Sequence, residues 1–197
     1  MKIYLASKSP RRQELLKQIG IEFAVLPFDI PELIAQGETA TQYSTRVTQD
    51  KLRVGWGKIL QDQRPQRPVL CADTEVVLDG EILGKPQNYQ HAFEMLKKYS
   101  GRSHQVLTSV GMQYDTYQKI LLNQTKVTFA PMTDADIHTY LATGDYEDKA
   151  GAYGIQTSIA QFICHIEGCF YSVMGLPLYL VHELMTDLRQ QVTDFPA

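Results

Sequence analysis

An apolar run at Val69–Leu78 constrains the fold of this chain more than any other stretch, because it predicts a buried central strand. The run contains Asp73, and a central strand does not bury a carboxylate unless that group is paired or binds a metal. Asp79-Gly80 follows at once and predicts a type I′ hairpin. The returning strand would bring Lys85 toward the level of Asp73 or Glu75. We therefore expect an acid–base cluster at an edge of the sheet.

The opening of the chain predicts a strand, a tight loop and a helix. Residues 2–6 are short and apolar, and apolar residues then recur at helical spacing as far as Gly20. Ser9 suits the cap of this helix and Pro10 its first position. The free N–H groups of the helix start, with the adjacent Arg11 and Arg12, suit an anion such as phosphate. From these residues alone, a capped helix with two solvated arginines is an equally good interpretation.

The rest of the chain alternates strand and helix patterns, which predicts an α/β fold. A polar loop near residue 30 carries Asp29 and Glu32 outside any helix pattern. The glycines and small residues at 148–156 would let the backbone approach a ligand closely, although a tight packed turn explains them equally well. Gly55 and Gly57 are interpreted as a tolerated pair on a helix. We expect further helices over 41–60, 88–99, 133–143 and 175–188, and further strands over 22–26, 106–112, 119–122, 125–129, 163–166 and 171–174.

Length, composition and charge exclude several classes of protein. The 197 residues, 44% hydrophobic and 21% charged, fit an ordinary soluble globular domain. The formal net charge of −3 argues against a nucleic-acid partner, so any nucleotide must be bound by a local cluster of cations. No apolar run predicts a membrane span or a signal peptide, and we expect a cytoplasmic location. The three cysteines predict neither a disulfide framework nor a zinc site, and Cys71 is expected in the core.

Several short motifs, in this order and spacing, resemble the Maf family of nucleotide pyrophosphatases from Ile3 to about Leu188. Each motif alone is weak, and the set is specific. The motifs are Ser7-Lys8-Ser9-Pro10-Arg11-Arg12, Asp29-Ile30-Pro31-Glu32, Asp50-Lys51, Ala72-Asp73-Thr74, Gly84-Lys85-Pro86, Ser100-Gly101, Asp148-Lys149-Ala150-Gly151-Ala152-Tyr153-Gly154-Ile155-Gln156 and Gly175-Leu176-Pro177.

The resemblance implies a fold and a reaction. The fold would be a mixed twisted sheet with flanking helices, in two lobes around a deep cleft, as in inosine triphosphatases. We expect one such domain over residues 1–190 and a frayed tail over 191–197. The reaction would be hydrolysis of a nucleoside triphosphate to the monophosphate and pyrophosphate, with Mg²⁺ or Mn²⁺. The oligomeric state is left open between a monomer and a homodimer.

Matching the family motifs residue by residue implies catalytic roles. Asp73 would be the general base and, with Glu32, a metal ligand. Lys51 and Lys85 would be further cations; from the residues alone, ordinary surface lysines would be preferred. Arg11 and Arg12 would hold the phosphate chain, and the hydroxyl of Ser7 would contact phosphate or metal.

Substrate choice rests on three further matches. Arg12, Thr74 and Gln156 resemble the branch of the family that prefers dTTP and UTP, a class that extends to modified pyrimidine nucleotides. The amide of Gln156 can pair with the O4 and N3–H edge of uracil or thymine. One alternative is a branch that prefers 7-methyl-GTP. Another is a non-catalytic nucleotide-binding regulator of septum formation. Glu75 departs from the family, which usually has an aliphatic residue there.

Overall fold

The computed structural model describes residues 1–192, so most of the predicted tail lies outside the described residues. Within that range the chain forms a seven-stranded mixed sheet in the order β2-β1-β3-β5-β6-β7, with β4 paired to β3. The strands are β1 (Ile3–Leu5), β2 (Phe23–Val25), β3 (Val69–Leu78), β4 (Glu81–Leu83), β5 (Ser103–Tyr114), β6 (Tyr117–Phe129) and β7 (Ile163–Glu167). The α/β fold expected from the sequence is confirmed.

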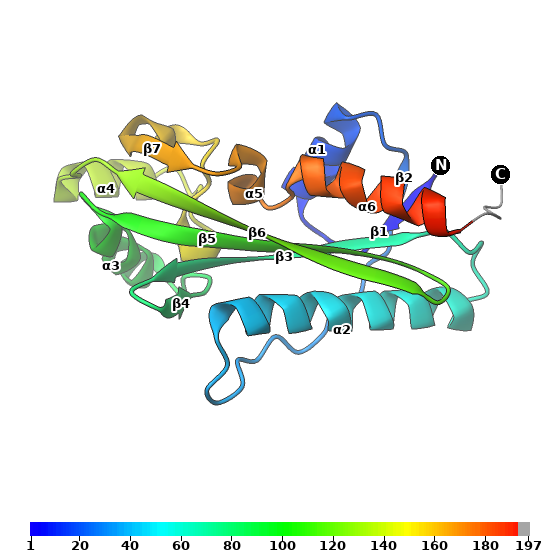
Figure 1. Cartoon of the computed structure of the whole chain (residues 1–197). Coiled ribbons are helices and arrows are strands. Elements are labelled where there is room, and N and C mark those ends of the chain that lie inside the picture. The colour runs from blue at the N-terminus through cyan, green and yellow to red at the C-terminus, as the bar shows by residue number, and fades with distance from the viewer. Residues whose placement is uncertain (193–197) are drawn as a thin grey trace.

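Helices cover both faces of the sheet, as Figure 1 shows, with α2 on one face and α1, α5 and α6 on the other. Helices α3 and α4 pack together at the end of the molecule remote from the N-terminus. The helices are α1 (Pro10–Gln18), α2 (Ala40–Gln61), α3 (Tyr89–Tyr99), α4 (Asp134–Leu141), α5 (Phe170–Met174) and α6 (Leu178–Gln191), with short 3₁₀ turns η1 (Ala150–Ala152) and η2 (Ser158–Phe162). None of the described helices is long and apolar enough to cross a membrane.

Local signals account for most of the element boundaries. Helix α4 begins with the predicted capping box, in which Thr133 and Asp136 satisfy each other's backbone N–H groups. Asp79 and Gly80 both have positive φ, 51° and 83°, as the type I′ turn requires. Pro10 occupies the first turn of α1 as expected, although the Ser9 side chain makes no capping hydrogen bond. These boundaries follow from sequence because each depends on neighbouring residues only.

Two predicted strands are wrong. Residues 125–129 are not a separate strand, because β6 runs unbroken from Tyr117 to Phe129. Asn123 and Gln124, which lie between the two predicted strands, pair with Thr108 and Leu107 of β5 within the sheet. Residues 171–174 form helix α5, which Gly175 ends with a φ of 108°. A left-handed glycine at this position is a common helix end, and a four-residue apolar run does not distinguish strand from helix.

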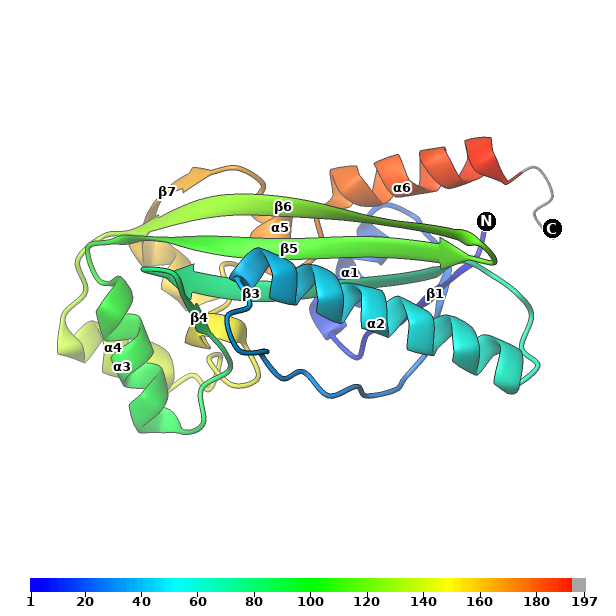
Figure 2. The ribbon, with the colours of Figure 1, turned by 60° about the horizontal axis from the view of Figure 1, so that its bottom comes forward.

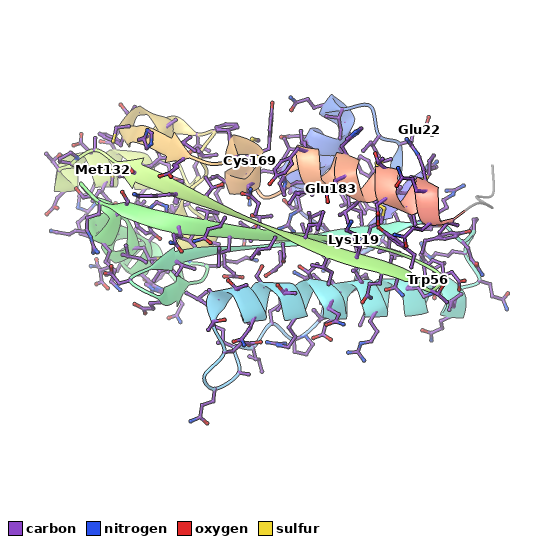
Figure 3. The ribbon with its side chains drawn as sticks, viewed as in Figure 1. Glu22, Trp56, Lys119, Met132, Cys169 and Glu183 are labelled. Carbon is purple, nitrogen blue, oxygen red and sulfur yellow. The ribbon has the colours of Figure 1, made fainter. Side chains whose placement is uncertain are left out.

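The long sheet carries two hydrophobic cores, one toward each end. Trp56 belongs to the first core and Met132 to the second, and Figure 3 shows them at opposite ends of the molecule. Between the cores a band of polar residues crosses the middle of the sheet. In this polar band Asp73 is opposite Ser109, and Thr74 is opposite Thr108. The predicted two lobes correspond to these two cores.

Strand β3 has an open edge where the polar band crosses it. On one side β3 pairs with β5 over Val69–Val77. On the other it pairs with β1 only at Val69 and Leu70, and with β4 only from Val76 onward. Among the described strands, none pairs with residues 71–75 on that side. Asp73, Thr74 and Glu75 therefore lie at a gap in the sheet.

The glycine pair on α2 gives a prediction. A Cβ at Gly55 would lie 3.1 Å from Val69 Cγ1 and 3.2 Å from Phe28 Cε1, whereas a Cβ at Gly57 would meet nothing within 4 Å. Gly57→Ala should raise the free energy of unfolding by about 0.5–1 kcal/mol through helix propensity. For Gly55→Ala, the free energy of unfolding should be lower than for Gly57→Ala by about 1 kcal/mol or more, because the added methyl group crowds the packing against Phe28. Urea denaturation measures both, and equal gains would contradict the close packing at Gly55.

Candidate active site

A cleft of about 720 Å³ lies at the gap in β3. Its walls come from the loop before α1, the segment between β2 and α2, β3 itself, the residues after β4 and the 148–156 segment. Figure 2 shows the segment between β2 and α2 running back alongside α2, which brings it to the cleft. All the residues that the sequence selected line this one cleft: Ser7, Arg11, Arg12, Glu32, Lys51, Asp73, Thr74, Lys85 and Gln156.

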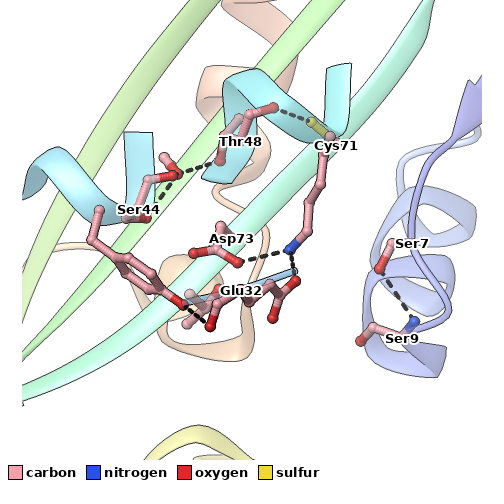
Figure 4. Close-up of polar contacts among 12 residues, drawn as sticks. Ser7, Ser9, Glu32, Ser44, Thr48, Cys71 and Asp73 are labelled. Carbon is pink, nitrogen blue, oxygen red and sulfur yellow. Dashed lines mark hydrogen bonds and ion pairs between the residues drawn. The ribbon is translucent and has the colours of Figure 1, made fainter. Parts of the chain in front are cut away.

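An ion-paired cluster forms the α2 side of the cleft. The ammonium group of Lys51 lies 2.8 Å from Asp73 Oδ1 and 2.7 Å from Glu32 Oε1 (Figure 4). Burial alone would lower the pKa of Lys51, but the two carboxylates outweigh burial and the net shift is upward. The expected acid–base cluster therefore exists, but its cation is Lys51. Lys85 reaches the same cleft as an exposed side chain and makes no ion pair with any described residue.

The carboxylates leave oxygen atoms for a further ligand. Asp73 is 5% exposed, and its Oδ2 accepts no hydrogen bond from the described part of the chain. A buried carboxylate oxygen without a partner is costly unless a cation or a donor is supplied. Glu75 lies beside it and forms no ion pair with any lysine or arginine in residues 1–192. Burial, the charge of Asp73 and a side-chain hydrogen bond with Asp73 raise the pKa of Glu75 to about 9. Carboxylate oxygens are the ligands that Mg²⁺ and Mn²⁺ prefer.

The same residues do not form a complete metal cage. No group of three or more His, Cys, Asp or Glu side chains within residues 1–192 is arranged around one point. Asp73 and Glu32 could therefore supply only part of a coordination shell. Mg²⁺ commonly binds through one or two carboxylates and takes its other ligands from phosphate and water. The donor set fits a cation that arrives with a phosphorylated substrate.

Arg12 crosslinks the opposite wall of the cleft. Its Nε donates to the Gly175 carbonyl oxygen at 2.8 Å, and its two terminal nitrogens donate to Ser7 Oγ at 3.2 Å and to Thr74 Oγ1 at 3.1 Å. Thr108 also donates to Thr74 Oγ1. The guanidinium fork thus joins the start of α1, the middle of β3 and the end of α5. It fixes the side chain of Thr74 at the gap in the sheet.

Arg11 differs sharply from its neighbour. It lines the cleft, and its side chain makes no hydrogen bond or ion pair with any described residue. Burial lowers the pKa of Arg11, an effect that Glu14 partly opposes. Of the two arginines, Arg11 is the one with all its donors available for an anion.

The 148–156 segment is tightly packed, as the second interpretation of its small residues expects, and it also lines the cleft. Close approach of its backbone to a ligand stays a prediction. Gly151 has a φ of 70°, and a Cβ there would lie 2.8 Å from both Tyr99 Oη and Val76 Cγ2. Its N–H donates to the carbonyl oxygen of Gly84, which ties the segment to the residues just before Lys85. Ala152 is buried and also has a positive φ, 62°, a strained backbone that is typical of functional sites.

Sequence comparison then identifies the family. The sequence model described as "Maf-like protein" matches residues 2–188. The chain belongs to the Maf family. The resemblance found in the sequence is confirmed, and most of the motifs that carried it contribute residues to the cleft.

Related proteins from the Maf family carry a consistent name. A protein of Nitrosomonas europaea is 44% identical over 193 residues, which is 94% of this chain and 93% of that protein, and is named dTTP/UTP pyrophosphatase. A protein of Chromobacterium violaceum with the same name is 44% identical over 90% of this chain and 90% of its own length. One of Escherichia coli, also with this name, is 45% identical over 95% of this chain and 93% of its own length. The solved structure of the Staphylococcus aureus Ham1 protein is a more distant match, with 17% identity and a TM-score of 0.46 over 66% of this chain and 72% of that one.

Some residues that line or support the cleft were not selected from the sequence. Thr108 and Ser109 lie in the polar band, where Thr108 supports Thr74 and Ser109 joins β5 to Ser44 of α2 (Figure 4). Two adjacent hydroxyls in an otherwise apolar strand were the available signal. Lys149 also lines the cleft, and its only signal was its place inside a Maf-family motif.

The two adjacent arginines give a matched prediction. Arg12→Lys should lower the free energy of unfolding by about 1–3 kcal/mol, because lysine keeps the charge but cannot reproduce the three-way fork. Arg11→Lys should change it by less than about 0.5 kcal/mol, because Arg11 has no partner in residues 1–192 to lose. Thermal and chemical unfolding of both variants test this contrast. Equal destabilisation would show that Arg12 is not the crosslink described.

Proposed function

We propose that this chain is a nucleoside triphosphate pyrophosphatase that converts dTTP and UTP to the monophosphate and pyrophosphate. One observation carries the proposal: a single cleft joins a carboxylate cluster with a spare buried oxygen on Asp73 to a wall of unpaired cations. The names of the relatives from Nitrosomonas and Escherichia support the same reaction and substrates. A cytoplasmic location belongs to the proposal, and a homodimer stays a prediction.

The acidic wall would hold the divalent metal and the attacking water. Asp73 and Glu32 would bind Mg²⁺ or Mn²⁺, and the bound ion would supply positive charge to the phosphate oxygens. Asp73 would also accept the proton of the attacking water. Lys51 keeps the two carboxylates in place through its two ion pairs. Water would then form a bond to the α-phosphorus as the bond to the bridging oxygen breaks and pyrophosphate leaves.

The positively charged wall would hold the phosphate chain and the nucleobase of the substrate. Arg11, Lys85 and the free N–H groups of the α1 start can bind phosphate oxygens. Arg12 fixes the position of the Thr74 side chain. It would therefore influence recognition of the nucleobase indirectly, through Thr74. Gln156 lies exposed at the same cleft, where its amide can pair with O4 and N3–H of uracil or thymine.

A nucleotide panel tests the proposal. Purified chain with Mg²⁺ or Mn²⁺ should release pyrophosphate fastest from dTTP and UTP, measured by coupled phosphate detection. Fastest release from 7-methyl-GTP would instead assign the chain to another branch. Binding without pyrophosphate release from any nucleotide would favour the non-catalytic regulator.

Substitution of Asp73, the proposed general base, gives a further prediction. Asp73→Asn should reduce kcat by about 100-fold or more, because the amide accepts no proton from water. The Kd for dTTP should stay within about threefold, because the cations of the other wall are unchanged. Single-turnover kinetics and equilibrium binding separate the two effects. A variant that keeps its turnover would remove Asp73 from the role of base.

Metal dependence gives a third prediction. A chelator should abolish pyrophosphate release, and added Mg²⁺ or Mn²⁺ should restore it. Glu32→Gln should raise the metal concentration needed for half-maximal rate by about tenfold, because one charged ligand is lost. Titration of the rate against free metal measures this. An unchanged titration curve would exclude Glu32 as a ligand.

A further inference from the structure

The lysines and arginines around the cleft differ in whether the protein already neutralises them. Lys8 pairs with Asp29 at 2.7 Å, and Lys51 pairs with Asp73 and Glu32. The side chain of Lys149 makes no hydrogen bond or ion pair with any residue in the described range, and the same holds for the side chain of Arg11. The cleft thus contains two half-buried positive charges that form no ion pair within the described range, although nearby acidic residues offset them in part.

The side chain of Lys149 packs against a position where the sequence has a glycine, Gly154. A Cβ at Gly154 would lie 3.0 Å from Lys149 Cε and 3.1 Å from its Cδ. The alkyl stem of Lys149 therefore lies directly over Gly154, which also lines the cleft. Gly154 does not have a positive φ, so close approach of side chains, and not backbone conformation, accounts for a glycine there. Besides Lys149, Thr157 Cγ2 would lie 3.2 Å from a Cβ at this position.

Lys149 and Arg11 also affect each other. Burial lowers the pKa of Lys149, and the positive charge of Arg11 lowers it further, while the acidic residues Asp145 and Asp148 oppose the shift. Two like charges in one half-buried site repel each other unless an anion is bound between them. This arrangement is unfavourable in the free protein and favourable with a polyanion.

We propose that Lys149 and Arg11 together form the subsite for the end of the phosphate chain that leaves as pyrophosphate. Lys149 would bind the terminal phosphate oxygens across the cleft from the start of α1, and Gly154 would give its side chain the room to do so. The identity of the ligand rests on the proposed function. The subsite itself can be tested with inorganic pyrophosphate, without any turnover.

The test measures binding of inorganic pyrophosphate by calorimetry in the presence of Mg²⁺. Lys149→Gln should weaken binding by about tenfold or more, the effect of losing one charge-assisted hydrogen bond. Lys149→Arg, which keeps the charge, should bind within about threefold of wild type. The difference between wild type and Lys149→Gln should shrink as the ionic strength rises, because salt screens the lost charge. A purely structural role for Lys149 would not produce this salt dependence.

Two further variants sharpen the test. Gly154→Ala should displace the Lys149 side chain and weaken pyrophosphate binding by about threefold, but should add nothing in the Lys149→Gln background, because both changes act through one side chain. Lys126→Gln removes an equal charge from an exposed position on β6 and should leave binding unchanged. Melting temperatures verify that each variant is folded.

The outcomes separate this inference from the proposed function. If wild type hydrolyses dTTP but folded Lys149→Gln binds pyrophosphate as tightly as wild type, the subsite is overturned and the function stands. If wild type hydrolyses no nucleotide but loses pyrophosphate binding on Lys149→Gln, the subsite stands and the function falls. An equal loss with Lys126→Gln would also overturn the subsite, because overall charge alone would explain it.

Discussion

The ammonium group of Lys51, held between Asp73 and Glu32, is the interaction on which the rest of the site depends. Asp73 is buried in a central strand beside a second carboxyl group, Glu75, and such a site is unfavourable without a compensating charge. Lys51 supplies that charge from α2, and the same group draws the segment that carries Glu32 against the cleft. One cation therefore fixes the relative positions of a strand, a helix and a loop.

The position of the cleft follows from how this sheet buries its polar residues. The polar band separates two cores, and β3 loses its neighbour on one side at the same level, where β1 has ended and β4 has not begun. Side chains from both faces of the sheet can meet at that open edge. Asp73 projects toward α2, whereas Thr74 projects toward Arg12 and α5. A continuous β3 edge would have kept the acidic face and the Arg12 face apart.

Two kinds of feature could be predicted from the sequence: turns and helix ends, which depend on neighbouring residues, and residue types that a buried strand rarely tolerates. The capping box of α4, the Asp79-Gly80 turn and the anomaly at Asp73 are all of these kinds. Prediction failed where pairing over long range decides the outcome. Asn123 and Gln124 look like a break until β5 lies beside them, and the partner of Asp73 is Lys51 of α2 because the helix crosses the polar band, which no local pattern reveals. The different environments of Arg11 and Arg12 likewise depend on Gly175, 163 residues further along the chain than Arg12.

The two walls of the cleft carry opposite charge imbalances, and this has a consequence for binding. On the α2 side, the carboxylates of Glu32 and Asp73 share one cation, Lys51. On the other side, the side chains of Arg11 and Lys149 form no ion pair with any described residue. A divalent cation alone would relieve only the first imbalance, and a polyphosphate alone only the second. Each ligand also lowers the electrostatic cost of placing the other, since their charges attract across the cleft. The charge distribution of the free protein therefore favours the metal and the phosphate chain binding together over either binding alone.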